Sequence, residues 1–195
     1  MKASRPRFVV GIGGSAGGLK AYTAFLDALP ATTGMAFVVV CHLFPVANTL
    51  LAELLSAHTK MPLRVAAQGM AIKRNHVYVI PPNADLLIED EAFKIVSPRS
   101  QRNKQVDLFF SSLAEAFGSR AIGIIFSGYD GDGTEGCKNI KARGGTTFAQ
   151  DDSAEVGGMP LSAQGSGAID HVLAPGLIPA ALQALARRAR KAVPG

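Results

Sequence analysis

An apolar content of 48% and a net charge of +5 over 195 residues indicate a folded domain and exclude a disordered tail. The longest strongly apolar stretch, about 35–44, is far shorter than the ~20 residues that a membrane-spanning helix needs, and no signal segment precedes the first predicted strand. Cys41 and Cys137 cannot build a disulfide framework, and no Cys and His cluster has metal-ligand spacing. We therefore expect one soluble, cytoplasmic domain over 1–195 that binds no metal.

Short β-branched runs alternate with stretches of helical spacing in the first third of the chain. The runs cover 8–10 and 36–40, and the helical stretches cover 19–29 and 49–59. This alternation predicts an α/β fold, with a parallel sheet that carries helices on its faces.

Four strand candidates separated by turn residues come next, at 64–67, 76–80, 85–89 and 92–96. They follow one another closely, with no helical stretch between them. We therefore expect a small, partly antiparallel hairpin region inserted in the fold.

The alternation returns in the second half of the chain. A helical stretch at 106–117 precedes a buried-type strand at 121–126, and a helix at 134–143 precedes a strand at 146–149. A helix, a short strand and a terminal helix complete the chain.

The terminal helix ends in a basic cluster made of Arg187, Arg188, Arg190 and Lys191. No aromatic residues are interleaved with these cations, so the stacking residues of a nucleic-acid site are missing. We favour a solvated helix C-terminus, stabilised by the helix dipole, over a docking patch, and we expect no nucleic-acid partner.

A Gly-rich turn at 11–18 follows the first predicted strand and holds Ser15. Gly13 to Gly17 fits the G-x-S-x-G pattern, in which a tight strand-to-helix turn exposes a nucleophilic serine. The same residues fit a dinucleotide fingerprint, but that motif needs an acidic residue after the next strand, where Cys41 and His42 stand. A plain connecting turn is the third interpretation.

Three strand ends carry residues that suit nucleophilic catalysis. Ser15 and His42 follow consecutive parallel strands, whose carboxyl ends share one sheet edge, so a serine with a histidine base is feasible. An acidic turn after the 121–126 strand offers Asp130 or Asp132 to orient the histidine. The residues themselves do not choose between these two, and Asp151 and Asp152 lie beyond another strand at the same edge. Backbone amides of Ala16 and Gly17, with that of Tyr129, are candidate oxyanion donors.

The other histidines and the Cys41 thiol are better explained by structural roles than by catalysis. His58 and His76 are placed on a helix and in the hairpin region, where a structural histidine is common. Cys41 precedes His42 on a strand, so the two side chains point to opposite faces and do not readily form a pair.

Six sequence blocks together resemble the catalytic domain of CheB-type protein-glutamate methylesterases, with a likeness that covers about 8–185. The blocks are GIGGSAGGL from Gly11, VVVCHLFP around His42, HVYVIPPN from His76, VDLFFSSLAEAFG from Val106, SGYDGDGTEG from Ser127 and AQDDSAEVGGMP from Ala149. LAELLSAHTKMP from Leu51 is most similar to the branch fused to chemotaxis methyltransferases.

The resemblance implies a doubly wound, mainly parallel sheet and a Ser15, His42 and Asp132 triad that works without a cofactor. The aspartate before glycine in the family turn falls on Asp132, whereas Asp130 stands where glycine is usual. The implied reaction is hydrolysis of glutamate methyl esters on chemoreceptor signalling helices, with deamidation of receptor glutamines as a second activity. The implied partners are the receptor's cytoplasmic helical domain and a separate regulatory or methyltransferase protein, because the chain begins at the first catalytic strand and leaves no room for a receiver domain.

This chain departs from the family pattern near the expected site. Gly14 replaces a usual alanine, Phe44 lies between His42-Leu43 and Pro45, and Tyr129 and Asp130 replace two smaller residues. These changes keep open an alternative function, a non-catalytic binding module that retains the fold. The intact Ser, His and Asp set favours the enzyme.

Overall fold

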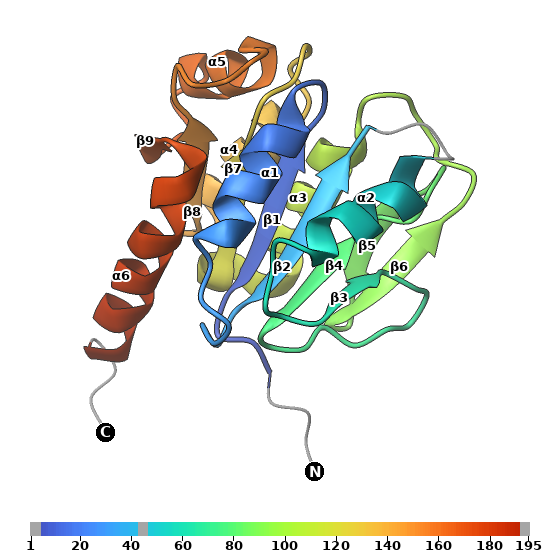
Figure 1. The fold of residues 1–195 in the computed structure, drawn as a ribbon, viewed down its shortest axis with the longest axis horizontal. Helices are drawn as coiled ribbons and strands as arrows, with labels where there is room; N and C mark the ends of the chain where they lie inside the picture. The colour runs from blue at the N-terminus through green and yellow to red at the C-terminus, as the bar shows by residue number, and fades with distance from the viewer. Residues whose placement is uncertain (1–4, 43–46, 192–195) are drawn as a thin grey trace.

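The fold is an α/β sandwich built on one parallel sheet (Figure 1). The computed structural model describes residues 5–42 and 47–191. The sheet contains β1 (Val9–Gly14), β2 (Ala36–Cys41), β3 (Leu63–Val65), β4 (His76–Val79), β7 (Ala121–Ile125), β8 (Thr146–Gln150) and β9 (His171–Leu173). Their order is β3-β4-β2-β1-β7-β8-β9, and every pairing among them is parallel.

Helices cover both faces of this sheet, as predicted. The helices are α1 (Gly18–Asp27), α2 (Ala47–Ser56), α3 (Gln105–Phe117), α4 (Thr134–Ala142), α5 (Gly158–Gly165) and α6 (Ile178–Lys191), with short 3₁₀ turns η1 (Gly118–Arg120) and η2 (Pro175–Leu177). In Figure 1, α1 and α2 lie in front of the sheet and α3 and α4 lie behind it. The doubly wound α/β prediction is confirmed.

The hairpin region is smaller than predicted. In the part of the chain that the structure describes, the antiparallel strands are β5 (Asp85–Glu89) and β6 (Ala92–Val96), with one isolated antiparallel bridge from Ala71 to Ala92, while β3 and β4 extend the parallel sheet. The placement of His76 in the hairpin region was therefore wrong, since it begins β4. Residues 66–75 connect β3 to β4 without a helix. A helix usually connects two parallel strands, so the sequence did not indicate that these two strands pair parallel.

The first strand is longer than predicted, because it runs through the glycines to Gly14. All six residues of β1 are buried between β2 and β7, and α3 lies directly against the strand. A Cβ atom at Gly11 would lie 2.7 Å from Phe110 Cε1 of that helix. Glycine is needed here for close helix-to-strand packing, and the turn itself begins only at Ser15.

Parts of the predictions lie outside the described residues. These are residues 1–4 of the predicted domain, Leu43, Phe44 and Pro45 in the block around His42, and 192–195 at the C-terminal end. Within the described residues, one apolar core extends from Phe8 to Ala186.

Candidate active site

The carboxyl ends of β1, β2 and β7 bring the predicted site residues to one edge of the sheet. Gly14 and Cys41 are register partners in the parallel β1 and β2 pair, so Ser15 and His42 follow at neighbouring positions. Asp132 lies in the loop between β7, on the other side of β1, and α4. From β1 the chain adds β2, β4 and β3 on one side and β7, β8 and β9 on the other, so the strand order reverses at β1. Open α/β sheets bind their ligands at such a switch point.

Ser15 lies in a tight turn that the backbone holds from two sides. Its amide donates a hydrogen bond to Ser127 O at 2.8 Å, and its carbonyl accepts one from the Gly18 amide at 2.9 Å. Gly17 closes the turn with a φ of 72°, in the left-handed region that glycine tolerates best. The Ser15 side chain is half-buried, and its hydroxyl hydrogen-bonds to none of the described residues.

His42 is oriented by Asp132. Its Nε2 lies 2.5 Å from Asp132 Oδ2, and the side chains are 5% and 0% exposed, respectively. A carboxylate only accepts hydrogen bonds, so Nε2 carries the proton and Nδ1 is left as the basic nitrogen. Asp130 Oδ2 lies 3.9 Å from Nδ1, beyond hydrogen-bond distance but close enough to stabilise an imidazolium. The pairing with Asp132 is therefore the direct one.

The N-terminus of α3 holds the Asp132 carboxylate in place. Oδ2 accepts a hydrogen bond from the Val106 amide at 3.0 Å, and Oδ1 accepts one from the Asp107 amide at 2.8 Å. These amides are otherwise unpaired at a helix start, where the dipole also favours negative charge. The buried carboxylate is thus compensated before it meets the histidine.

Asp107 is a supporting residue that the sequence did not single out. Its Oδ1 accepts the Gly136 amide at 2.9 Å in the first turn of α4, and its Oδ2 pairs with Lys104 Nζ at 3.1 Å. This hydrogen bond, followed by the charges of Asp107, Asp132 and Asp130, raises the pKa of Lys104. The sequence signal was the acidic residue at the start of a predicted helix.

Ser127 and Gln150 are further supporting residues that the sequence did not single out. Ser127 Oγ donates to Ala16 O at 2.8 Å and accepts a hydrogen bond from the Val156 amide at 2.9 Å. Gln150 Oε1 accepts the Ser127 amide at 3.0 Å. Both side chains are buried, and their hydrogen bonds connect the Ser15 turn to the loops after β7 and β8. Both residues lie within the sequence blocks described above, which was the signal that could have identified them.

Gly14 lies over a buried tyrosine. A Cβ atom at Gly14 would lie 2.5 Å from the Tyr22 hydroxyl oxygen, which has no hydrogen-bond partner among the described residues. Burial, and then the neighbouring Cys41, raise the pKa of Tyr22. The Tyr22 hydroxyl thus occupies the space that a side chain at position 14 would need.

The remaining candidates lie apart from the His42 and Asp132 pair. His58 Nδ1 pairs with Asp27 at 3.0 Å, and His76 Nδ1 bonds to Arg74 O at 2.9 Å. Asp151 accepts hydrogen bonds from Ser153 within its own turn. Cys41 is buried on the side of β2 that faces Tyr22, and no disulfide links it to Cys137.

The arrangement can support nucleophilic chemistry on a carbonyl group. The amides of Ala16, Gly17 and Tyr129 donate hydrogen bonds to no described acceptor, which is one requirement of oxyanion donors. Within 5–42 and 47–191, no group of three His, Cys, Asp or Glu side chains could hold a metal ion. None of the helices in these ranges is both long and apolar enough to cross a bilayer.

Comparison with known proteins identifies relatives that share this fold and sequence. The CheB methylesterase family model matches residues 10–182. A Leptospira interrogans protein, provisionally named protein-glutamate methylesterase/protein-glutamine glutaminase, is 34% identical over 83% of this chain and 86% of its own length. A Burkholderia orbicola protein-glutamate methylesterase/protein-glutamine glutaminase is 35% identical over 85% of this chain, which spans half of that relative.

A solved structure agrees with both comparisons. The crystal structure of the Thermotoga maritima CheB methylesterase catalytic domain superposes with a TM-score of 0.85 at 29% identity, over 93% of this chain and 100% of that one. The chain therefore belongs to the CheB methylesterase family.

Proposed function

We propose that this chain is a cytoplasmic serine hydrolase that demethylates glutamate methyl esters on chemoreceptor signalling helices. Ser15 is the nucleophile, His42 the base and Asp132 the orienting acid. The observation that carries the proposal is the hydrogen bond between His42 Nε2 and Asp132 Oδ2. His42 directly follows Cys41 at the end of β2, and Ser15 directly follows its register partner Gly14 at the end of β1.

The first half of the reaction forms an acyl-enzyme. Ser15 Oγ attacks the ester carbonyl carbon while its proton moves to His42 Nδ1, and Asp132 stabilises the resulting imidazolium. The carbonyl oxygen becomes an oxyanion, which the Ala16, Gly17 and Tyr129 amides can receive. When the tetrahedral intermediate collapses, the C–O bond to the methoxy group breaks, and methanol leaves with the proton from His42.

The second half of the reaction releases the glutamate. Water attacks the acyl carbon, gives its proton to His42 Nδ1, and the bond from Ser15 Oγ to that carbon breaks as Oγ recovers the proton. A glutamine side chain would follow the same course with ammonia as the leaving group. Glutamine deamidation is therefore the second activity that we propose.

Features around the site suit a protein substrate. Tyr129 is 78% exposed in the loop that carries Asp132, and Leu161 on α5 is 66% exposed. Large exposed apolar side chains beside a catalytic loop are typical of interaction surfaces. The relatives named above support a glutamyl substrate, and a separate regulatory or methyltransferase protein is a further proposed partner.

Methanol release from methylated receptor cytoplasmic fragments tests this function. Ser15→Ala should keep the fold and lower turnover by about 10⁴ to 10⁶. Ser56→Ala, which changes an exposed serine whose hydroxyl bonds to Glu53 O within α2, is the matched control and should retain activity. Full methyl-ester hydrolysis by Ser15→Ala would contradict the assignment.

A fluorophosphonate probe separates the enzyme from a binding module with the same fold. We expect labelling of the wild type that Ser15→Ala abolishes. A wild type that remains unlabelled would favour the module, which the exposed Tyr129 and the added Asp130 carboxylate also suit.

A further inference from the structure

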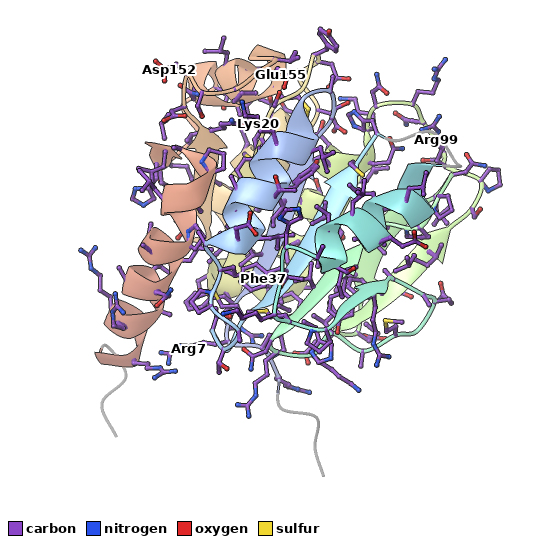
Figure 2. The ribbon with its side chains drawn as sticks, in the orientation of Figure 1. Arg7, Lys20, Phe37, Arg99, Asp152 and Glu155 are labelled. Carbon is purple, nitrogen blue, oxygen red and sulfur yellow. The ribbon has the colours of Figure 1, made fainter. Side chains whose placement is uncertain are left out.

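A groove lies at the end of the sheet opposite the candidate active site. It has a volume of about 560 Å³, and its lining residues come from the segment before β1, from η1, from the start of β8 and from the second half of α6. They are Arg7, Phe8, Ser119, Arg120, Thr146, Leu185, Arg188 and Ala189. Figure 2 labels Arg7 at the foot of the sheet, close to the end of α6.

The groove carries positive charge that the described residues leave largely uncompensated. None of its eight lining residues is acidic, and neither Arg7 nor Arg188 pairs with a carboxylate in 5–42 or 47–191. Arg120 Cζ lies 5.1 Å from the centre of the Phe117 ring. The ion pair of Arg120 with Glu91 is long, with 3.9 Å between Nη2 and Oε1, so it compensates the charge weakly. Guanidinium groups bind carboxylates in a planar, two-bonded geometry, so this cluster suits an acidic ligand.

Between the arginines the groove is apolar. Phe8 is 6% exposed, Leu185 packs against the core, and Ala189 lies one turn further along α6. A free phosphate or other small anion would make no use of these side chains. A ligand that combines carboxylates with apolar side chains satisfies both features.

We propose that this groove binds an acidic, amphipathic segment of a partner protein. A single-stranded nucleic acid would need exposed aromatic side chains for stacking, whereas the lining aromatic, Phe8, is buried. A flat membrane surface would reach the exposed Arg188 at the rim but not the recessed Phe8. A peptide helix can place leucine-like side chains in the groove and carboxylates on the arginines.

The position of the groove gives the interaction a tethering role. Ser15, His42 and Asp132 lie at the carboxyl ends of the strands and the groove at their amino ends, so about 17–20 Å of sheet separates them. A bound segment therefore leaves the active site open. On a partner that also carries the substrate of the proposed function, binding at the groove would raise the local concentration of the enzyme near that substrate.

Binding of a model peptide tests this proposal. The probe is a fluorescein-labelled peptide of about 18 residues, with leucine at helical spacing and glutamate at most other positions, measured by fluorescence anisotropy. A peptide of the same composition in scrambled order reports simple charge attraction. We expect the ordered peptide to bind more tightly than the scrambled one.

Three variants locate the binding. Arg7→Glu with Arg188→Glu should weaken binding by about tenfold or more. Lys73→Glu with Arg74→Glu makes the same charge change on exposed residues that precede β4 and do not line the groove, and should weaken binding less than about twofold. Ala189→Gln keeps the charge but fills the groove, should also weaken binding, and keeps the test informative if the double reversal perturbs folding.

Hydrolysis of a small ester such as p-nitrophenyl acetate should be equal in the wild type and all these variants, because the groove is remote from Ser15. Equal weakening by the groove pair and the control pair, or no binding of the ordered peptide, would overturn the proposal. Groove-dependent cosedimentation with phosphatidylserine vesicles in the absence of peptide binding would assign the groove to membranes instead.

Discussion

Asp132, in the loop before α4, binds the start of α3, and Asp107, in the first turn of α3, binds the start of α4. Asp132 accepts the Asp107 amide at 2.8 Å at the start of α3, and Asp107 accepts the Gly136 amide at 2.9 Å at the start of α4. Both carboxylates are nearly or fully buried. The position of the candidate catalytic acid is therefore coupled to the packing of two helices.

Asp107→Ala should destabilise the protein by about 1–3 kcal/mol, because it leaves the buried Gly136 amide without a partner. Turnover should fall as well, since the loop that carries Asp132 loses support. The free energy of unfolding from urea denaturation measures the first effect. Glu135→Ala, which removes an exposed carboxylate paired with Lys138 on the same helix, should cost less than about 0.5 kcal/mol. Equal losses in the two variants would refute the coupling.

Asp132→Asn should lower kcat by about 10⁴, whereas Asp130→Asn should lower it less than about tenfold. An amide at position 132 can donate to His42 Nε2, which shifts the imidazole proton to Nδ1 and blocks proton transfer from Ser15. Asp130 lies 3.9 Å from Nδ1 and makes only a charge interaction with His42, while its Oδ1 accepts the Asp132 amide at 3.1 Å, a bond that the asparagine side-chain oxygen can keep. Methanol release from methylated receptor fragments measures both values, and the reverse ranking would transfer the orienting role to Asp130.

The convergence of the site could be predicted from strand order alone. Parallel strands place their carboxyl ends together, so Ser15 and His42 had to be neighbours once the runs at 8–10 and 36–40 were read as consecutive parallel strands. The choice of Asp132 over Asp130 came only from the family resemblance. The structure gives the physical difference, because Asp132 lies within reach of both the α3 amides and His42 Nε2.

Features set by long-range packing were not visible in the sequence. The need for glycine at position 11 of β1 comes from Phe110, about a hundred residues away. The parallel β3 and β4 pairing is made through a return segment without a helix. Ser127 was overlooked for a similar reason. Its hydroxyl bonds to Ala16 O, which only the tertiary fold brings near.

Gly14→Ala should destabilise the protein by about 1–3 kcal/mol, because the new methyl group meets the Tyr22 hydroxyl. Tyr22→Phe removes that hydroxyl, which no described residue binds, and should be neutral or stabilising by about 1 kcal/mol. The double variant should therefore be more stable than Gly14→Ala alone. The free energies of unfolding of the two single variants and the double variant, from urea denaturation, measure the coupling between the two positions. If both single variants lose stability and the double variant loses the sum of the two, the contact between them is disproved.

Asp170 should make stability dependent on acid pH. Burial alone would raise the pKa of Asp170, but hydrogen bonds from Lys141 at 2.7 Å and from the Thr147 amide and hydroxyl, both at 3.0 Å, lower it overall. A carboxyl with a lowered folded pKa adds stability above its unfolded value of about 3.9, and that stability is lost as the pH falls through the folded pKa.

Because solvent screens this partly exposed carboxylate, Asp170→Asn should cost only about 0.5–1 kcal/mol near pH 7 and reduce the loss of stability between about pH 4 and pH 2. The free energy of unfolding, measured across this range, checks both effects. Asp152→Asn makes the same charge change at an exposed carboxylate that lacks the Lys141 and Thr147 hydrogen bonds of Asp170, and should keep the wild-type pH dependence. If Asp170→Asn retains the full acid loss as well, the carboxylate between β8 and β9 does not contribute to it.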